Sequence, residues 1–365
     1  MISSLGFTGR LAANALAVQE RLSLAQTQAA SGHRAESWGG YAPQARALID
    51  VNTGIARYGA YIAAIDLAGP RLETVQTALT RMDTLVGDLR KRALAAIGTG
   101  PVDLAAIRAE ALSALGEIAT MLNTDTGGRH VFGGSDNTSP PVPAGQAIAG
   151  GAGGPSLFND IAARLATLDG TPGNTLADVW TDLTAYAADD AAGRTIFSAA
   201  LSAPGPGGIQ DEPAPTALVA DGHRIAVGLR TPAFRDPALA AADPASTGSW
   251  MRDLIRDVMV LATLPESTGT AGELAGLMRS VADSLDATQT RLNGDASAMG
   301  TAQVTLASVR DRHTQTVDML KAHRGDLQDA DLTEVSARIA LLRTQLESSW
   351  ALLARLEELS LTRFI

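Results

Sequence analysis

The chain contains no cysteine, and this absence excludes several kinds of site together. Without a thiol there is no disulfide, no thiolate zinc site and no cysteine nucleophile. Aromatic residues make up only 4% of the 365 residues, whereas 45% are hydrophobic. Because alanine and leucine supply most of that apolar content, the composition favours helix packing over a small-molecule pocket. The composition therefore argues against an enzyme, and we expect no cofactor and no metal.

Basic stretches and long apolar runs are missing as well. The formal net charge is -10, and no basic stripe is long enough to follow a phosphate backbone, so no nucleic-acid partner is expected. No run of 18 apolar residues occurs, which argues against membrane insertion. The opening MISSLGFTGRLAANALAVQ lacks the charged start, apolar core and cleavage site of a signal peptide. Export would therefore need another route.

Proline is absent from both ends of the chain and divides it into parts. None precedes Pro43 and none follows Pro265, while thirteen of the sixteen prolines lie from Pro140 to Pro265. Proline interrupts helices, so two proline-poor ends should be helical and flank a different kind of middle. The length leaves room for more than one domain.

Both ends carry the apolar spacing of long helices. Near the start, apolar residues alternate steps of four and three from Leu11 to Ala29, the seam of a coiled coil. A loop is expected at about 31–43, and a further helix at 104–122. The far end repeats the pattern, with a break around 323–331 before the last helix. A helix of about 50 residues would extend roughly 75 Å, so such helices are expected to pack on each other.

The middle reads as a small α+β insert. Asp221-Gly222 stands between two short apolar runs, which predicts a hairpin, and 156–168 and 176–187 have the pattern of short amphipathic helices. A further hairpin is expected at 128–136. The predicted fold is mainly α: a long coiled-coil-like helical rod formed by the N- and C-terminal segments, with a small α+β inserted domain. The predicted segments are 1–43 (N-terminal helix and loop), 44–139 (rod), 140–245 (insert), 246–322 (rod) and 323–365 (C-terminal helix).

Three stretches resemble a known family. They are QTQAASGHRAESWGGYAPQARAL at 26–48, GGRHVFGGSDNTSPPV at 127–142 and DLQDADLTEVSARIALLRTQLESSWALLARLEELSLTRFI at 326–365. Together with the helices between them, they resemble the bacterial flagellin superfamily over about 1–140 and 245–365, and within it the hook-filament junction proteins, also called hook-associated protein 3. His130 stands where an aromatic residue is usual, and WGGYAP replaces the usual paired aspartates.

The resemblance implies a structural subunit of the bacterial flagellum without catalytic activity. Such a subunit leaves the cell through the flagellar type III export apparatus, has no cleaved signal peptide and is extracellular. It polymerises with its two terminal helices in the inner core, while the insert faces outward. The implied partners are other copies of itself, a neighbouring hook-associated protein, flagellin, and a flagellar export chaperone on the C-terminal helix.

The terminal seams are the predicted self-assembly interface. An apolar seam at a chain's end cannot bury itself alone, whereas copies arranged around an axis can bury one another's seams. The alternative is that the tail folds back within its own monomer. Trp350 is expected to pack at a seam. The predicted interface residues are Leu11, Val18, Leu22, Leu332, Val335, Ile339, Leu342, Leu346, Leu353, Leu356, Leu359, Leu361 and Phe364.

Three other functions stay open. A filament flagellin would share the terminal helices and differ in copy number. A cytosolic helical scaffold would share the heptads but has no need of the "LSL" close near the C-terminus. An enzyme in the middle insert would require a convergent titratable cluster, and none is visible in the sequence. The five histidines lie far apart in sequence and include no pair four residues apart.

Overall fold

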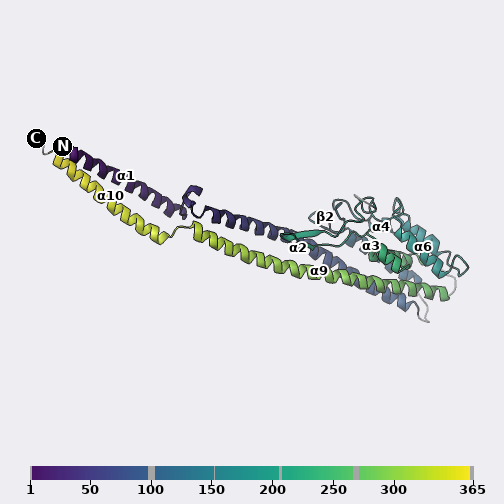
Figure 1. The fold of residues 1–365 in the computed structure, drawn as a ribbon. Coiled ribbons are helices and arrows are strands. Elements are labelled where there is room, and N and C mark those ends of the chain that lie inside the picture. The colour runs from purple at the N-terminus through teal and green to yellow at the C-terminus, as the bar shows by residue number, and fades with distance from the viewer. Residues whose placement is uncertain (1, 98–102, 152, 205–207, 266–270, 362–365) are drawn as a thin grey trace. The chain divides into compact units, whose positions relative to one another are not determined.

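The computed structural model describes residues 2–97, 103–151, 153–204, 208–265 and 271–361. Helices dominate it, and the predicted mainly α fold, with long packed helices and a small insert, is confirmed (Figure 1). The chain forms two compact units. Unit 1 comprises Met1–Ala60 together with Arg312–Ile365, and unit 2 comprises Tyr61–Asp311.

Unit 1 contains the two terminal helices and the breaks that separate them from the long helices. Helix α1 spans Ile2–Ser31 and α10 spans Leu332–Leu361, and the two lie side by side (Figure 1). A short 3₁₀ helix, η1, spans Trp38–Tyr41. The unit also holds the beginning of α2 (Ala45–Ala95) and the end of α9 (Ala271–Gln328).

Within unit 2, the remaining parts of α2 and α9 run antiparallel beside each other. Polar pairs mark their register: Arg310 Nε lies 2.6 Å from Asp66 Oδ1, and Arg90 Nη2 lies 2.9 Å from Asp286 Oδ1. Between these two pairs, the Gln289 amide donates to Asp83. Apolar residues at steps of three and four fill the interface between the helices, including Leu72, Leu79, Leu285 and Leu292.

One helix of unit 2 is buried along its whole length. Helix α8, Trp250–Ala262, contacts α3, α5 and α6, and all 13 of its residues are buried. Its apolar side chains belong to the same core as the long helices of unit 2. The surrounding helices are α3 (Leu104–Leu122), α4 (Gly145–Ile148), α5 (Leu157–Leu165), α6 (Leu176–Ala188) and α7 (Pro237–Ala242).

Local sequence signals explain where several of these helices begin. Thr175 and Asp178 form a capping box at the start of α6, and each side chain accepts a backbone N–H of the other residue. Asp103 caps α3 by accepting from the Ala106 N–H at 3.0 Å. Asp236 caps α7, with Pro237 in the first turn where no N–H is needed.

The strands form two separate hairpins. Strand β3 (Thr216–Ala220) pairs with β4 (His223–Ala226) around Gly222, whose φ is 70°, so the hairpin predicted at Asp221-Gly222 is confirmed. The other hairpin, β1 (Asp125–Thr126) with β2 (Arg129–His130), lies earlier than the predicted 128–136. The reason is that Gly127 and Gly128 both adopt positive φ and make the turn themselves.

The predicted break in the C-terminal segment also lies elsewhere. Helix α9 continues through 323–328, and the break consists of residues 329–331 only. Gly325 lies inside α9, because an isolated glycine costs a helix only about 1 kcal/mol and does not stop it. The first helix ends at Ser31 and α2 begins at Ala45, which agrees with the predicted loop at about 31–43.

Candidate self-assembly surface

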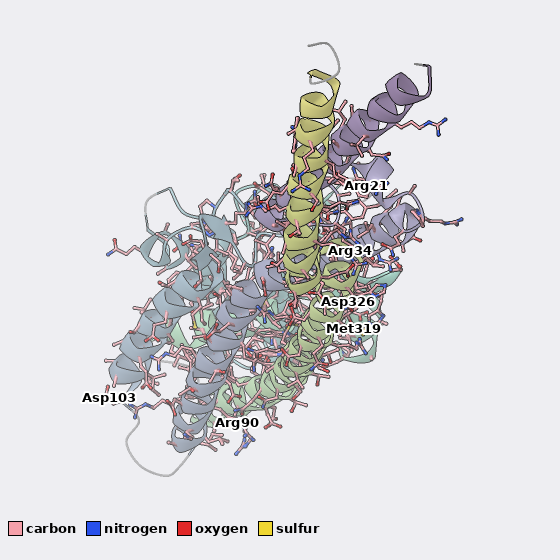
Figure 2. All side chains as sticks on the ribbon, turned by 90° about the vertical axis from the view of Figure 1, so that its left-hand side faces the viewer. Arg21, Arg34, Arg90, Asp103, Met319 and Asp326 are labelled. Carbon is pink, nitrogen blue, oxygen red and sulfur yellow. The ribbon has the colours of Figure 1, made fainter. Side chains whose placement is uncertain are left out.

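The terminal helices of unit 1 share one apolar seam. Val18, Leu22 and Ala25 of α1 pack against Val335 and Leu342 of α10, and none of the five is more than 9% exposed. The end of α1 lies beside the start of α10, so the pair is antiparallel (Figures 1 and 2). The seam is therefore closed within one chain, as in the alternative in which the tail folds back on its own monomer.

The predicted interface residues occupy different environments. Val18, Leu22, Val335 and Leu342 are buried in this seam, and Leu332 is 53% exposed. The partly buried set is Leu11, Ile339, Leu346 and Leu353. The side chains of Leu356, Leu359 and Leu361, and the whole of Phe364, lie outside the described residues.

A second apolar face lies on α1 away from the seam. Leu16 is 66% exposed and Leu24 is 59% exposed, although leucine is usually buried. They line an open groove of about 690 Å³, and Arg21, labelled in Figure 2, lies beside them. The rest of the groove is polar and consists of Gln19, Glu20, Ser23, Thr27 and Glu36. An apolar stripe with a polar rim is typical of a protein-binding surface.

Helix α10 exposes apolar side chains on both sides of its seam. At about 100° per residue, Leu341 and Leu352 point in nearly one direction, and they are 69% and 51% exposed. Leu332 and Trp350 are five turns apart on the other side, and Trp350 is 56% exposed. The expectation that Trp350 packs in the seam is therefore wrong. It lies about 40° from Leu346 around the helix, at the edge of the seam.

The breaks after α1 and before α10 are tied together by the backbone. The Arg34 N–H donates to the Gln328 carbonyl at 2.8 Å, and the Ala330 N–H donates to the Gly32 carbonyl at 2.8 Å. Between them, His33 and Asp329 form an isolated antiparallel bridge, and their side chains lie 3.3 Å apart. The Arg34 guanidinium adds a bond of 2.8 Å to the Asp329 carbonyl. The chain thus leaves α1 and enters α10 at neighbouring positions, near Arg34, which Figure 2 labels.

Tyr41 holds the loop of the first break against the second. Its side chain is 7% exposed, and its hydroxyl lies 2.8 Å from the Ala35 carbonyl and 3.3 Å from the Gln328 carbonyl. The short helix η1 positions this ring, since Trp38 and the two glycines after it lead directly to Tyr41. The WGGYAP stretch therefore supplies a hydrogen-bonded anchor for this loop.

Asp331 begins α10 as its capping residue. Its carboxylate accepts from the Thr333 N–H at 2.8 Å and from the Glu334 N–H at 3.2 Å. These backbone hydrogen bonds hold the pKa of Asp331 below its ordinary value. The DADLTE stretch that resembles the family thus sets the direction in which α10 leaves the break.

Unit 2 has a cavity of about 440 Å³ between the β4–α7 loop, α8 and α9. Trp250 Nε1 donates to Asp295 at 2.8 Å, and burial raises the pKa of Asp295. Arg291 binds the Ser246 hydroxyl, and Asp236 caps α7, so both serve structural contacts. Among the residues that the structure describes, no group of three or more histidine, aspartate or glutamate side chains is placed to hold a metal ion.

One known protein family matches the C-terminal helices of the chain. Residues 282–365 match the family model of the bacterial flagellin C-terminal helical region. That range includes the greater part of α9 and all of α10 as described. The search of curated proteins found no match. Over the described parts of the chain, none of the helices combines the length and the hydropathy that crossing a membrane requires.

The match supports a place in the flagellin superfamily and a structural, flagellin-like role in the bacterial flagellum. It also supports self-association and a location in the extracellular flagellum, because members of that family build flagellar polymers.

The apolar spacing of the sequence pointed to the seam between α1 and α10, but it did not lead us to the exposed apolar faces on the outer sides of these helices. Their signal was present as a second apolar spacing, in which Leu341 and Leu352 are eleven residues, or about three turns, apart.

Proposed function

We propose that this protein is a structural subunit that connects the flagellar hook to the filament and assembles through its paired terminal helices. The observation that carries the proposal is the exposure of large apolar side chains on α1 and α10 around a seam that is already closed. A helix pair that leaves Leu16, Leu24, Leu341 and Trp350 in water has surfaces that only other molecules can cover.

The expected gain in free energy favours association. Burial of one leucine side chain is worth about 1.5–3 kcal/mol. Several such residues per copy would offset the ordering of the helices and part of the freedom lost on association. The predicted seam residues contribute by keeping α1 and α10 together, and the outer faces form the contacts between copies. Leu356, Leu359, Leu361 and Phe364 belong to the same proposed interface.

The choice of the junction over the filament rests on the motif after α3. In the junction proteins, an aromatic-glycine pattern is followed by a proline-aromatic pattern, and here HVFGG is followed by SPPV. The structure gives this motif a defined shape: Phe132 is 2% exposed, and Gly134 has a φ of 60°. A Cβ added to Gly133 would lie 2.7 Å from the Asp136 carbonyl oxygen. Filament flagellin is the alternative.

The proposed partners follow from this position. On one side of the junction the subunit would contact a neighbouring hook-associated protein, and on the other side it would contact flagellin. Before export through the type III apparatus, α10 would present its exposed apolar residues to a helical export chaperone. Removal of residues 320–365 should abolish chaperone binding, and unchanged binding would contradict this part of the proposal.

Immunogold labelling of sheared flagella tests the junction directly. We expect label at one band between hook and filament. Label along the whole filament would support filament flagellin, and retention in the cytosol would support a scaffold. Concentrated or salted-out purified protein gives an independent test by sedimentation and electron microscopy. A junction subunit should stay monomeric or form short rings, whereas a filament flagellin should form long filaments.

A further inference from the structure

Helix α8 carries four charged side chains into the core of unit 2. Arg252 is 2% exposed and Asp253 is 3% exposed, while Arg256 and Asp257 are both 0% exposed. Such residues are almost never fully buried unless they are paired, because burial removes their hydration. For each of the four side chains, the loss of hydration is therefore offset only as far as hydrogen bonds and ion pairs replace the lost water.

Two of the four acquire a full set of partners. Arg252 donates to Asp190 at 2.5 Å and to two backbone carbonyls. Asp253 accepts from the Ser246 hydroxyl at 2.5 Å and from the Thr247 N–H at 2.8 Å. Arg291 Nη1 of α9 lies 3.5 Å from Asp253.

Arg256 divides its guanidinium between several acceptors. It donates to the Thr184 hydroxyl of α6, the Ser284 hydroxyl of α9 and the Ala245 carbonyl, at 2.7–2.9 Å. The same guanidinium lies over the ring of Trp180, 4.6 Å from the centroid. Its bonds to Asp257 reach only one oxygen, Oδ1, at 2.9–3.0 Å.

Of the four side chains, Asp257 is therefore the one whose lost hydration is only partly replaced. Its second oxygen, Oδ2, is buried and makes no hydrogen bond to any described residue. A buried carboxylate oxygen without a donor destabilises the charged form, whereas a bound proton removes the charge. The charged groups around it are Arg256 and Asp253 on α8, Arg291 on α9 with its other partner Asp243, and, further along α8, Arg252 with Asp190.

We infer that Asp257 is a buried proton-binding site that makes the stability of unit 2 depend on pH near neutrality. Burial raises the pKa of Asp257 to about 7, although Arg256 and the Ser284 hydroxyl act in the opposite direction. The inference concerns unit 2 and holds whether or not the protein serves at the hook-filament junction.

The direction of the pH dependence follows from the two states of Asp257. In the unfolded chain an aspartate loses its proton near pH 4, whereas in the folded unit it keeps the proton up to about pH 7. Between these values the folded state binds more protons, so stability falls as pH rises. One such group changes the unfolding equilibrium constant by up to about tenfold per pH unit, and the change ends above the folded pKa.

The test compares Asp257→Asn with wild type by urea unfolding of the full chain from pH 5 to 8.5. Trp38 and Trp350 are replaced by phenylalanine in both proteins, so that fluorescence reports Trp180 and Trp250 in unit 2. Relative to the asparagine variant, the wild-type unfolding constant should increase about tenfold per pH unit between pH 5 and 7. The matched control is Asp286→Asn, which removes a half-exposed carboxylate of α9 and should leave the wild-type slope unchanged.

A ratio of the two unfolding constants that stays constant across this range would overturn the inference. Carboxyl-labelled wild-type protein provides a second measurement that needs no folded variant. One aspartate carboxyl signal should titrate near pH 7 in carbon NMR. Asp295→Asn distinguishes that signal from Asp295, whose pKa burial also raises. If every aspartate signal titrates below about pH 5, Asp257 is not the proton-binding group we infer.

Discussion

The two units differ in the extent of their apolar cores. In unit 2, Leu72, Leu79 and Leu115 are at most 1% exposed, and they share one continuous core. In unit 1, Leu16 and Leu341 are 66% and 69% exposed, although each lies on a well-formed helix. The difference shows that unit 2 completes its core by itself, whereas unit 1 completes only a narrow seam. The outer faces of unit 1 are therefore where association has apolar surface left to bury.

The largest expected effect is on assembly. Leu16→Glu combined with Leu24→Glu should abolish polymer formation, because charges would replace the apolar face of α1 that copies must bury. Immunogold labelling of sheared flagella from cells that carry the variant measures the result. The control is Leu67→Glu in unit 2, where the side chain is 83% exposed and the substitution should be tolerated. Normal incorporation of the double variant into flagella would remove α1 from the proposed interface.

A core substitution should affect the units differently. Leu79→Ala removes a fully buried side chain of unit 2 and should lower its free energy of unfolding by about 2–5 kcal/mol. Leu342→Ala in the seam should weaken the pairing of α1 with α10 and leave the free energy of unfolding of unit 2 unchanged, because its side chain packs within unit 1. Urea unfolding and sedimentation of both variants check this. If Leu79→Ala and Leu342→Ala lowered the free energy of unfolding of the monomer equally, the proposed difference between the two units would be wrong.

Amide hydrogen exchange in dilute monomer should show the same contrast without mutation. The amides of α1 and α10 should exchange at least roughly a hundredfold faster than those of α8, because two helices held together by one narrow apolar seam open more easily than a helix buried along its whole length. In assembled protein, the difference should shrink as neighbouring copies cover the outer faces. Strong protection of both terminal helices in the monomer would show that unit 1 is already complete.

The smallest expected effect concerns the start of α10. Asp331→Ala should speed exchange at the Thr333 and Glu334 amides, because both N–H groups lose their acceptor. Acid should do the same to wild type. The pKa of Asp331 is lowered by folding, so its contribution is present above the ordinary aspartate pKa and is lost as pH falls through the folded pKa. Exchange at these amides that follows only the intrinsic pH dependence would contradict the cap.

The sequence was sufficient for the main elements because their signals are local. The bounds of α3, the hairpin at Asp221-Gly222 and the loop after α1 follow from apolar spacing, glycine and capping residues. The positions that depend on distant partners could not be predicted in this way. Trp350 lies near the seam in its spacing, yet only the structure shows that its side chain is 56% exposed.

The charges of α8 illustrate the same limit. A stretch that reads WMRDLIRDVMVL looks like an ordinary amphipathic helix with one charged, solvated face. That face is buried because residues from other elements form hydrogen bonds and ion pairs with its charged side chains. These residues are Asp190, Thr184, Ser284 and Arg291. Only the tertiary structure shows that the charges are paired and that one oxygen of Asp257 is not.

The main-chain hydrogen bonds between residues 32–34 and 328–330 have a consequence for insertions and deletions. Because these bonds join main-chain atoms, they hold the end of α1 beside the start of α10 whatever the side chains are. Adding or removing one residue between this tie and the seam would turn the affected helix by about 100° and point its seam away from its partner. Point substitutions in the connecting loops should thus be tolerated far better over evolutionary time than changes in their distance from the helices.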